Sequence, residues 1–260
     1  MSDRSAIEWT EATWNPTTGC DRVSEGCDNC YALRLAGRLK AAGSRRYQVD
    51  GNPKTSGPGF GLTLHWDKIT QPLSWRQGRF IFVNSMSDLF HPDVPREFIR
   101  QVFEVMAATP QHRYQILTKR PGRMASILRQ QQPDPLPNVW LGSSIETDHF
   151  VWRANLVRST PAAVRFLSLE PLLGPLPGLD LEGIDWVIVG GESGPGHRFI
   201  DPHWVRDLRE ECLSAGVAFF FKQWGGRTPK AGGRTLDGRT WDQMPSPELT
   251  RTRAASAVPS

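Results

Sequence analysis

The sequence of 260 residues has only four cysteines and no apolar run long enough to cross a membrane. Its first residues, "MSDRSAIEWTEATWN", contain no basic head followed by an apolar core, so we expect no secretory signal. No glycine-rich phosphate loop follows the first expected strand, which argues against a doubly wound nucleotide-binding sheet. We therefore expect a cytoplasmic protein that does not associate with membranes.

The few cysteines do not form the disulfide framework of a secreted domain, because three of the four lie between Cys20 and Cys30. In a reducing compartment such a group is typical of a metal site or of redox chemistry. The formal net charge of +4 permits nucleic-acid binding but does not require it. The length suits one large domain, and we expect a monomer.

Compact apolar runs rich in β-branched and aromatic residues predict buried parallel strands along most of the chain. Two further strands, expected at residues 5–10 and 61–66, bring the predicted total to eight. The six main runs are residues 79–85, 114–119, 139–145, 164–170, 185–191 and 218–224.

Amphipathic segments separate these strands and predict helices after Cys30 and within residues 95–108, 122–131, 148–159 and 201–216. Strands that alternate with helices over this length predict a parallel (β/α) barrel, complete or partial, of the TIM type. We expect one domain over residues 1–240 and a disordered tail over residues 241–260.

Polar side chains follow each of the six main strands. In a parallel barrel such positions share the C-terminal face, where barrel active sites lie, so the sequence predicts one polar cavity over an apolar core. Three glutamates, Glu146, Glu170 and Glu192, come directly after buried strands, where a carboxylate is costly without a partner. Cations that also follow strands, such as Lys119 and Lys222, are the expected partners.

The three clustered cysteines, Cys20, Cys27 and Cys30, are the strongest candidate ligands. They are one thiolate short of a closed zinc site and one short of the four that hold an iron–sulfur cube. From the spacing alone, zinc with a fourth ligand such as His65 or His91 and an iron–sulfur cluster remain equally open. Cys212 falls in the apolar register of its predicted helix, so we expect it to be a buried, inert thiol.

A three-cysteine loop after the first strand of a parallel barrel resembles the radical S-adenosylmethionine enzymes. That resemblance implies that three cysteines hold a [4Fe–4S] cluster whose fourth iron binds S-adenosylmethionine, and that cleavage of this cosubstrate gives a 5′-deoxyadenosyl radical. The sequence departs from the superfamily pattern, because the spacing is six then two and Asn29 stands where an aromatic residue is usual. The superfamily's glycine pair with glutamate follows the second strand, whereas "GGES" at residues 190–193 comes much later in this chain, so the two motifs do not correspond.

A closer resemblance covers residues 7–241, where blocks such as "WNPTTGCDRVSEGCDNCYA", "IFVNSMSDLFH" and "FLSLEPLLGP" are similar to the phage-type three-cysteine-motif family of mycobacteriophage and bacterial proteins. It implies an electron donor such as flavodoxin or ferredoxin, and it favours a nucleotide or nucleic-acid substrate. The residues expected to bind the cosubstrate are Asn84, Ser85, Ser143, Ser144, Glu146, Glu170, Glu192 and Ser193. Those expected to bind substrate or phosphate are Asp88, Lys119, Arg120, Lys222, Gln223 and Trp224.

The alternative is a non-catalytic, zinc-stabilised nucleic-acid-binding protein. In that interpretation the cysteines serve folding alone, and cations between Arg227 and Arg239 contact phosphates. Metal content separates the two hypotheses, because one predicts iron and sulfide and the other predicts zinc.

Overall fold

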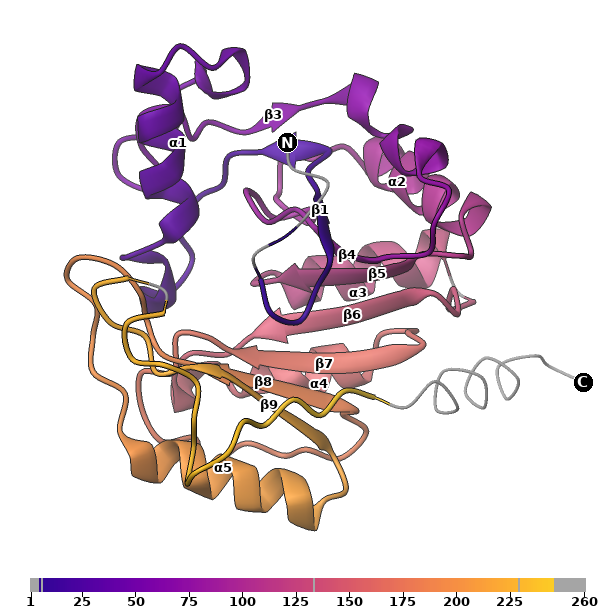
Figure 1. Ribbon diagram of the computed structural model, residues 1–260. Coiled ribbons are helices and arrows are strands. Elements are labelled where there is room, and N and C mark those ends of the chain that lie inside the picture. Colours follow the sequence, from indigo (N-terminus) through magenta and orange to yellow (C-terminus); the bar gives the residue numbers. More distant parts are fainter. Residues whose placement is uncertain (1–4, 6, 133, 229, 246–260) are drawn as a thin grey trace, which may run out of the picture.

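The computed structural model describes residues 5, 7–132, 134–228 and 230–245. Seven parallel strands form one sheet in the order β1-β4-β5-β6-β7-β8-β9, and the sheet curls into a half-barrel (Figure 1). The fold is thus the partial form of the predicted parallel barrel. The strands of this sheet are β1 (Ala12–Trp14), β4 (Phe80–Val83), β5 (Arg113–Thr118), β6 (Val139–Ser144), β7 (Val164–Leu169), β8 (Trp186–Gly190) and β9 (Ala218–Gln223).

Both strands that were expected beyond the six main runs differ from prediction. The first strand is β1, which begins seven residues later than expected. The second, β3 (Thr63–Leu64), pairs antiparallel with β2 (Thr17–Thr18) in a separate two-stranded sheet. The described part of the chain therefore has seven barrel strands in place of eight.

All helices but the first cover one face of the sheet, where Figure 1 shows α3 and α4 behind the strands. The apolar sides of all of these helices except α1 pack in one core with residues such as Ile81, Leu141 and Val187, whose strand neighbours point to the other face. The α1 helix packs in a separate cluster with Tyr47, Phe60 and Met86. The helices are α1 (Tyr31–Ala41), α2 (Arg96–Ala108), α3 (Pro121–Gln131), α4 (Trp152–Arg158) and α5 (Pro202–Ser214). Short 3₁₀ turns are η1 (Glu25–Cys27), η2 (Arg45–Tyr47), η3 (Trp66–Lys68), η4 (Gln71–Ser74) and η5 (Asp148–Phe150). No helix among the described residues combines the length and the apolar character needed to cross a membrane.

The opposite face of the sheet holds a second, aromatic core. Phe82, Trp140 and Trp186 belong to it, and Trp9 caps it from the segment before β1. Most of its aromatic pairs meet edge to face, as do Trp140 and Trp186, whose ring centroids lie 5.8 Å apart. With both faces buried, the strands read as nearly continuous apolar runs, which explains why the sequence located them well.

One crossover, between β7 and β8, has no helix. Residues 170–185 contain Pro171, Pro175 and Pro177, each of which lacks the N–H that a helix interior needs. The segment nevertheless covers the sheet, because leucines such as Leu172 and Leu176 are buried in the same core as the helices. At this crossover a proline-rich segment without a helix therefore covers the face of the sheet that helices cover elsewhere.

The segment after β9 returns to the sheet. Trp241 is buried, and its carbonyl accepts a hydrogen bond from the N–H of Phe221 at 2.9 Å. The tail expected from residue 241 lies outside the described residues from residue 246 onward.

Candidate functional site

A cavity of about 750 Å³ opens at the carboxyl ends of the strands. The cysteine segment, residues 20–31, forms one wall, and the segment after β9 contributes Thr228 and Lys230. Trp9, Phe82 and Leu117 from the aromatic core also line it. The predicted site residues found on its lining are Cys20, Cys27, Cys30, Asn84, Ser85, Asp88, Lys119, Arg120, Ser144, Glu170, Glu192, Ser193, Lys222 and Gln223.

Three predicted residues do not line the cavity. Ser143 points to the opposite side of β6 from Ser144, because side chains alternate along a strand, and its hydroxyl donates to the Thr118 carbonyl at 2.8 Å. Trp224 packs on Phe221, with ring centroids 4.6 Å apart. Glu146 is fully buried behind the lining.

The three cysteines are half-buried free thiols on the same wall of this cavity. Burial raises the pKa of Cys20 to about 12, with a further contribution from Asp88, and burial also raises the pKa of Cys30. The nearby Cys27 is a smaller cause of both raised pKa values. Cys212 is fully buried in the α5 core, away from this wall.

Within the described ranges, no three His, Cys, Asp or Glu side chains are grouped so as to hold a single metal ion.

Arg120 fixes the start of the cysteine segment. Its Nη1 donates to Cys20 Sγ at 3.5 Å and to Asp88 Oδ2 at 3.0 Å, and its Nη2 donates to the Asp21 carbonyl at 3.1 Å. Asp88 also accepts from the Thr118 hydroxyl at 2.7 Å. Because the Asp88 carboxylate is surrounded by donors from the protein, it orients Arg120 toward Cys20.

Glu146 holds the middle of the cysteine segment. Its Oε1 accepts from Ser24 Oγ at 2.9 Å and pairs with Lys119, while its Oε2 accepts from Arg153 Nη1 at 3.1 Å. Burial acts to raise the pKa of Glu146, but Lys119, Arg153 and Ser24 outweigh it and the pKa is lowered. A Cβ on Gly26 would lie 2.4 Å from Glu146 Cγ, so only glycine allows this close approach.

Glu192 holds the end of the cysteine segment. Asn29 Nδ2 donates to its Oε2 at 2.8 Å, and Arg198 donates to both oxygens, including Nη2 to Oε1 at 2.6 Å. The same Arg198 Nη2 reaches the Glu25 carbonyl at 2.9 Å. Burial acts to raise the pKa of Glu192, but the hydrogen bonds from Arg198 and Asn29 outweigh it and the pKa is lowered.

Glu170 differs from the other two glutamates. It follows β7, and its Oε1 lies 3.0 Å from Lys222 Nζ on β9. Its Oε2 has a long hydrogen bond from Ser168 at 3.5 Å. Both side chains of the ion pair keep some exposure, 15% for Glu170 and 22% for Lys222. This pair is therefore open to the cavity in a way that Glu146 is not.

Tyr31 brings a phenol close to Glu170 from the cysteine side. Its hydroxyl donates to the Ser85 carbonyl, and burial of this hydroxyl, with negative charge at Cys30 and Glu170, raises the pKa of Tyr31. The residue as a whole is 55% exposed. Asn84 and Ser85 meet the start of the chain, because Asn84 Nδ2 donates to Thr17 Oγ1 at 2.9 Å and Asn15 Nδ2 donates to Ser85 Oγ at 3.1 Å.

Sequence reasoning missed five residues that complete the site: Ser24, Asn29, Tyr31, Arg153 and Arg198. Ser24, Asn29 and Tyr31 adjoin the cysteines, and their polar side chains next to predicted ligands were the available signal. Arg153 lies on a helix, and nothing in the sequence shows that it is buried. In the structure only 2% of its side chain is exposed, and a buried arginine needs a carboxylate partner.

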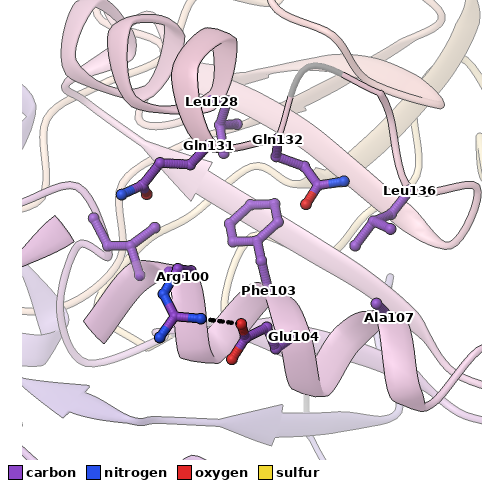
Figure 2. A pocket seen from close by; sticks show the side chains of 9 residues that line it. Arg100, Phe103, Glu104, Ala107, Leu128, Gln131, Gln132 and Leu136 are labelled. Carbon is purple, nitrogen blue, oxygen red and sulfur yellow. Dashed lines mark hydrogen bonds and ion pairs between the residues drawn. The ribbon is translucent and has the colours of Figure 1, made fainter. Parts of the chain in front are cut away.

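A second, smaller hollow of about 250 Å³ lies between α2 and α3. Figure 2 shows Phe103 at its centre, with the Arg100–Glu104 ion pair on one side and Gln131 and Gln132 on the other. None of the predicted site residues lines it, so we place the functional site at the larger cavity.

Comparison with known proteins identifies a family and a set of similar folds. A family model described as "Protein of unknown function (DUF5131)" matches residues 4–245. No curated protein matches the chain. Spore photoproduct lyase complexed with dinucleoside spore photoproduct is 14% identical, with a TM-score of 0.42 over 75% of this chain and 58% of that chain.

Two mutants of spore photoproduct lyase are similar to the same degree. A cysteine-to-serine mutant is 15% identical, with a TM-score of 0.47 over 81% of this chain and 63% of that one. A double mutant with bound AdoMet and dinucleoside spore photoproduct is 15% identical, with a TM-score of 0.43 over 76% and 59%. The chain thus spans about three-fifths of the length of these lyases, and the likeness concerns the arrangement of strands and helices.

Proposed function

This chain belongs to the family described as protein of unknown function (DUF5131), and we propose that it is an iron–sulfur enzyme that acts with S-adenosylmethionine. The observation that carries the proposal is the placement of Cys20, Cys27 and Cys30 on one wall of a large cavity at the carboxyl edge of a parallel half-barrel. The remaining thiol, Cys212, is sealed in the α5 core. Three thiolates with no fourth leave one coordination position for a cosubstrate.

The donor set fits a cluster. Thiolate sulfur is the ligand that iron–sulfur clusters require. Because the pKa values of Cys20 and Cys30 are raised, these thiols must lose their protons when the cluster binds. The positive charge of the metal centre favours that loss. Arg120 donates to Cys20 Sγ and Lys119 lies near Cys30, so positive charge is already placed beside the thiols.

Bound there, the cluster would supply the electron that cleaves S-adenosylmethionine and so provide a radical that abstracts hydrogen from a substrate. The protein's own residues then divide into two groups. Asp88, Glu146 and Glu192 orient the cysteine segment through Arg120, Ser24 and Asn29. This revises the sequence interpretation, in which Glu146 and Glu192 bind the cosubstrate and Asp88 binds the substrate.

The opposite side of the cavity binds ligand in this proposal. Glu170 offers a carboxylate to the cationic sulfonium and ammonium groups of S-adenosylmethionine, and Lys222 offers an ammonium to a carboxylate or phosphate. Ser144 and Ser193 add hydroxyls on the same lining. Ser193 Oγ is held in place by Gln223 Nε2 at 2.7 Å. The predicted flavodoxin- or ferredoxin-type electron donor, the monomeric state and the cytoplasmic location stay predictions.

Anaerobic purification followed by metal and sulfide analysis tests the proposal. We expect brown protein with about four iron and four sulfide per chain after reconstitution. Addition of S-adenosylmethionine to the reduced protein should change the electron paramagnetic resonance spectrum, because the cosubstrate would bind iron directly. Colourless protein with one zinc per chain would refute the proposal and support the zinc-stabilised alternative.

A further inference from the structure

The charge of this protein is concentrated in one segment beside the cavity. Residues 31–54, here called the basic arm, contain six Lys and Arg and a single Asp. The rest of the chain contains 25 Lys and Arg against 26 Asp and Glu. The modest net charge of the whole molecule therefore conceals one strongly basic element in an otherwise neutral protein.

The cations of this arm are available to a partner. Arg38, Arg45 and Lys54 are exposed, and none of them has an ion pair with any residue that the structure describes. Lys40, in contrast, is held by Asp50 at 2.5 Å. Three exposed cations without an ion pair on one short segment concentrate positive charge that an anionic partner can neutralise.

The arm is continuous with the cysteine wall. It begins with α1, which follows Cys30 directly and stands beside the carboxyl edge of the sheet in Figure 1. Tyr31 and Leu33 line the cavity, and a Cβ on Gly194 would lie 2.2 Å from Arg34 Nη1, so the arm borders the cavity rim. Its buried side, which includes Ala36 and Tyr47, packs against Phe60 and Met86 and holds the arm in place.

We propose that the basic arm binds the phosphate backbone of a single-stranded nucleic acid and delivers one nucleotide to the cavity. This rests on the proposed function, because it takes the cavity as the reaction site. The 11 residues of α1 span about 16 Å along the helix axis, which is long enough for the arm to contact more than one phosphate of a single strand. Tyr31, which is 55% exposed at the junction of arm and cavity, supplies an aromatic ring where a base would enter.

Fluorescence anisotropy with a labelled 12-nucleotide single strand tests this inference over a series of salt concentrations. The double variant Arg38→Gln/Arg45→Gln should bind at least about tenfold more weakly at low salt than the wild-type protein. The slope of log K against log salt should also fall by about 1.4, because each neutralised phosphate contributes about 0.7 for single strands. A dinucleotide should compete poorly, since it cannot reach along the arm.

A matched control removes the same charge elsewhere. Arg76 and Arg129 are exposed and have no ion pair with a described residue, and they lie before β4 and on α3, outside the cavity lining. Arg76→Gln/Arg129→Gln should leave the affinity and the salt slope close to wild type. Equal losses in both double variants would overturn the proposal, because they would show attraction to net charge alone.

Other partners give distinct outcomes. Binding to phosphatidylserine vesicles without binding to the oligonucleotide would refute the proposal, and so would equal affinity for poly-glutamate of the same charge. Iron and sulfide content, measured on the same samples, separates this inference from the proposed function. Protein that holds a cluster but does not bind the strand would contradict the arm alone, and protein that binds the strand without iron would contradict the enzyme alone.

Discussion

On the cysteine side of the cavity, buried carboxylates are surrounded by donors, whereas on the opposite side Glu170 and Lys222 have little beyond one another. Glu146 is fully buried and has a lysine, an arginine and a serine as partners. Glu170 has one ion pair and one long hydrogen bond. Since an ionised carboxylate offers about four acceptor sites, three donors from the protein occupy most of those of Glu146, whereas Glu170 retains more free ones.

This difference separates carboxylates that hold the cysteine segment in place from a carboxylate that can bind a ligand. A buried carboxylate whose acceptor sites are mostly occupied by donors of its own protein fixes a loop, and its removal leaves the cations buried without a partner. A carboxylate with free acceptor sites at a cavity surface can exchange solvent for a ligand at little structural cost. We therefore expect substitutions on the two sides to damage different properties.

The largest expected effect comes from the thiols. Cys27→Ala should lower bound iron from about four per chain to nearly none, because three ligands leave no redundancy. Cys212→Ala should retain the iron and lose only core packing energy. Iron and sulfide analysis after anaerobic reconstitution measures both. Full iron in the Cys27 variant, or its loss in the Cys212 variant, would contradict the cluster assignment.

The next effect concerns the holding side. Glu146→Gln leaves Lys119 and Arg153 without their carboxylate, and Arg153 is only 2% exposed. We expect the free energy of unfolding to fall by about 3 kcal/mol at pH 7, as measured by urea denaturation. Glu97→Gln, in which the lost carboxylate is on the surface of α2, should leave the urea midpoint close to wild type and serves as the control.

The pH dependence of the same variant follows from the lowered pKa of Glu146. A carboxyl group whose pKa is lower in the folded state contributes stability above its unfolded pKa, about 4.3 for glutamate. That contribution is lost as the pH falls through the folded value. The difference between wild type and Glu146→Gln should therefore shrink below about pH 4, and a constant difference would argue against a charge effect.

On the ligand-binding side of the cavity, we expect substitutions to change stability less and ligand affinity more. Glu170→Gln should lower S-adenosylmethionine affinity about tenfold, because the cationic cosubstrate loses an opposite charge. Its urea midpoint should stay near wild type, since Lys222 remains partly exposed. Calorimetric titration into the reconstituted protein measures the affinity. If Glu146→Gln retains its cluster yet lowers the affinity as much as Glu170→Gln does, the two sides do not differ as proposed.

The sequence predicted the strands well and the division between the two sides poorly. Buried parallel strands are apolar on both faces, so six of them could be located from composition alone. The alternation within β6 separates Ser143 from Ser144, and only knowledge of the strand's orientation assigns one to the cavity. Partners of the carboxylates lie far along the chain, as Asn29 does from Glu192, and a sequence does not display such contacts.

The smallest effect is expected at Asp237, which also has two cationic partners but is exposed. Arg206 Nη2 lies 2.9 Å and Arg209 Nη1 lies 2.6 Å from its oxygens, and these arginines lower the pKa of Asp237 to about 2. Asp237 has a backbone φ of 51° and the next residue, Gly238, has a φ of 82°. Two successive positive φ angles are typical of a tight Asp-Gly hairpin turn.

Asp237→Asn preserves that turn, because asparagine tolerates the left-handed conformation, and removes only the charge. Solvent screens exposed pairs, so the Tm at pH 7 should fall only slightly, and 1 M salt should erase the difference. The pair's contribution is present above the unfolded pKa near 3.9 and is lost as the pH falls toward 2. Thermal unfolding of Asp237→Asn and Glu146→Gln at both salt concentrations compares the exposed and buried pairs directly. A loss at Asp237 as large and as salt-resistant as the loss at Glu146 would show that burial does not set the difference between them.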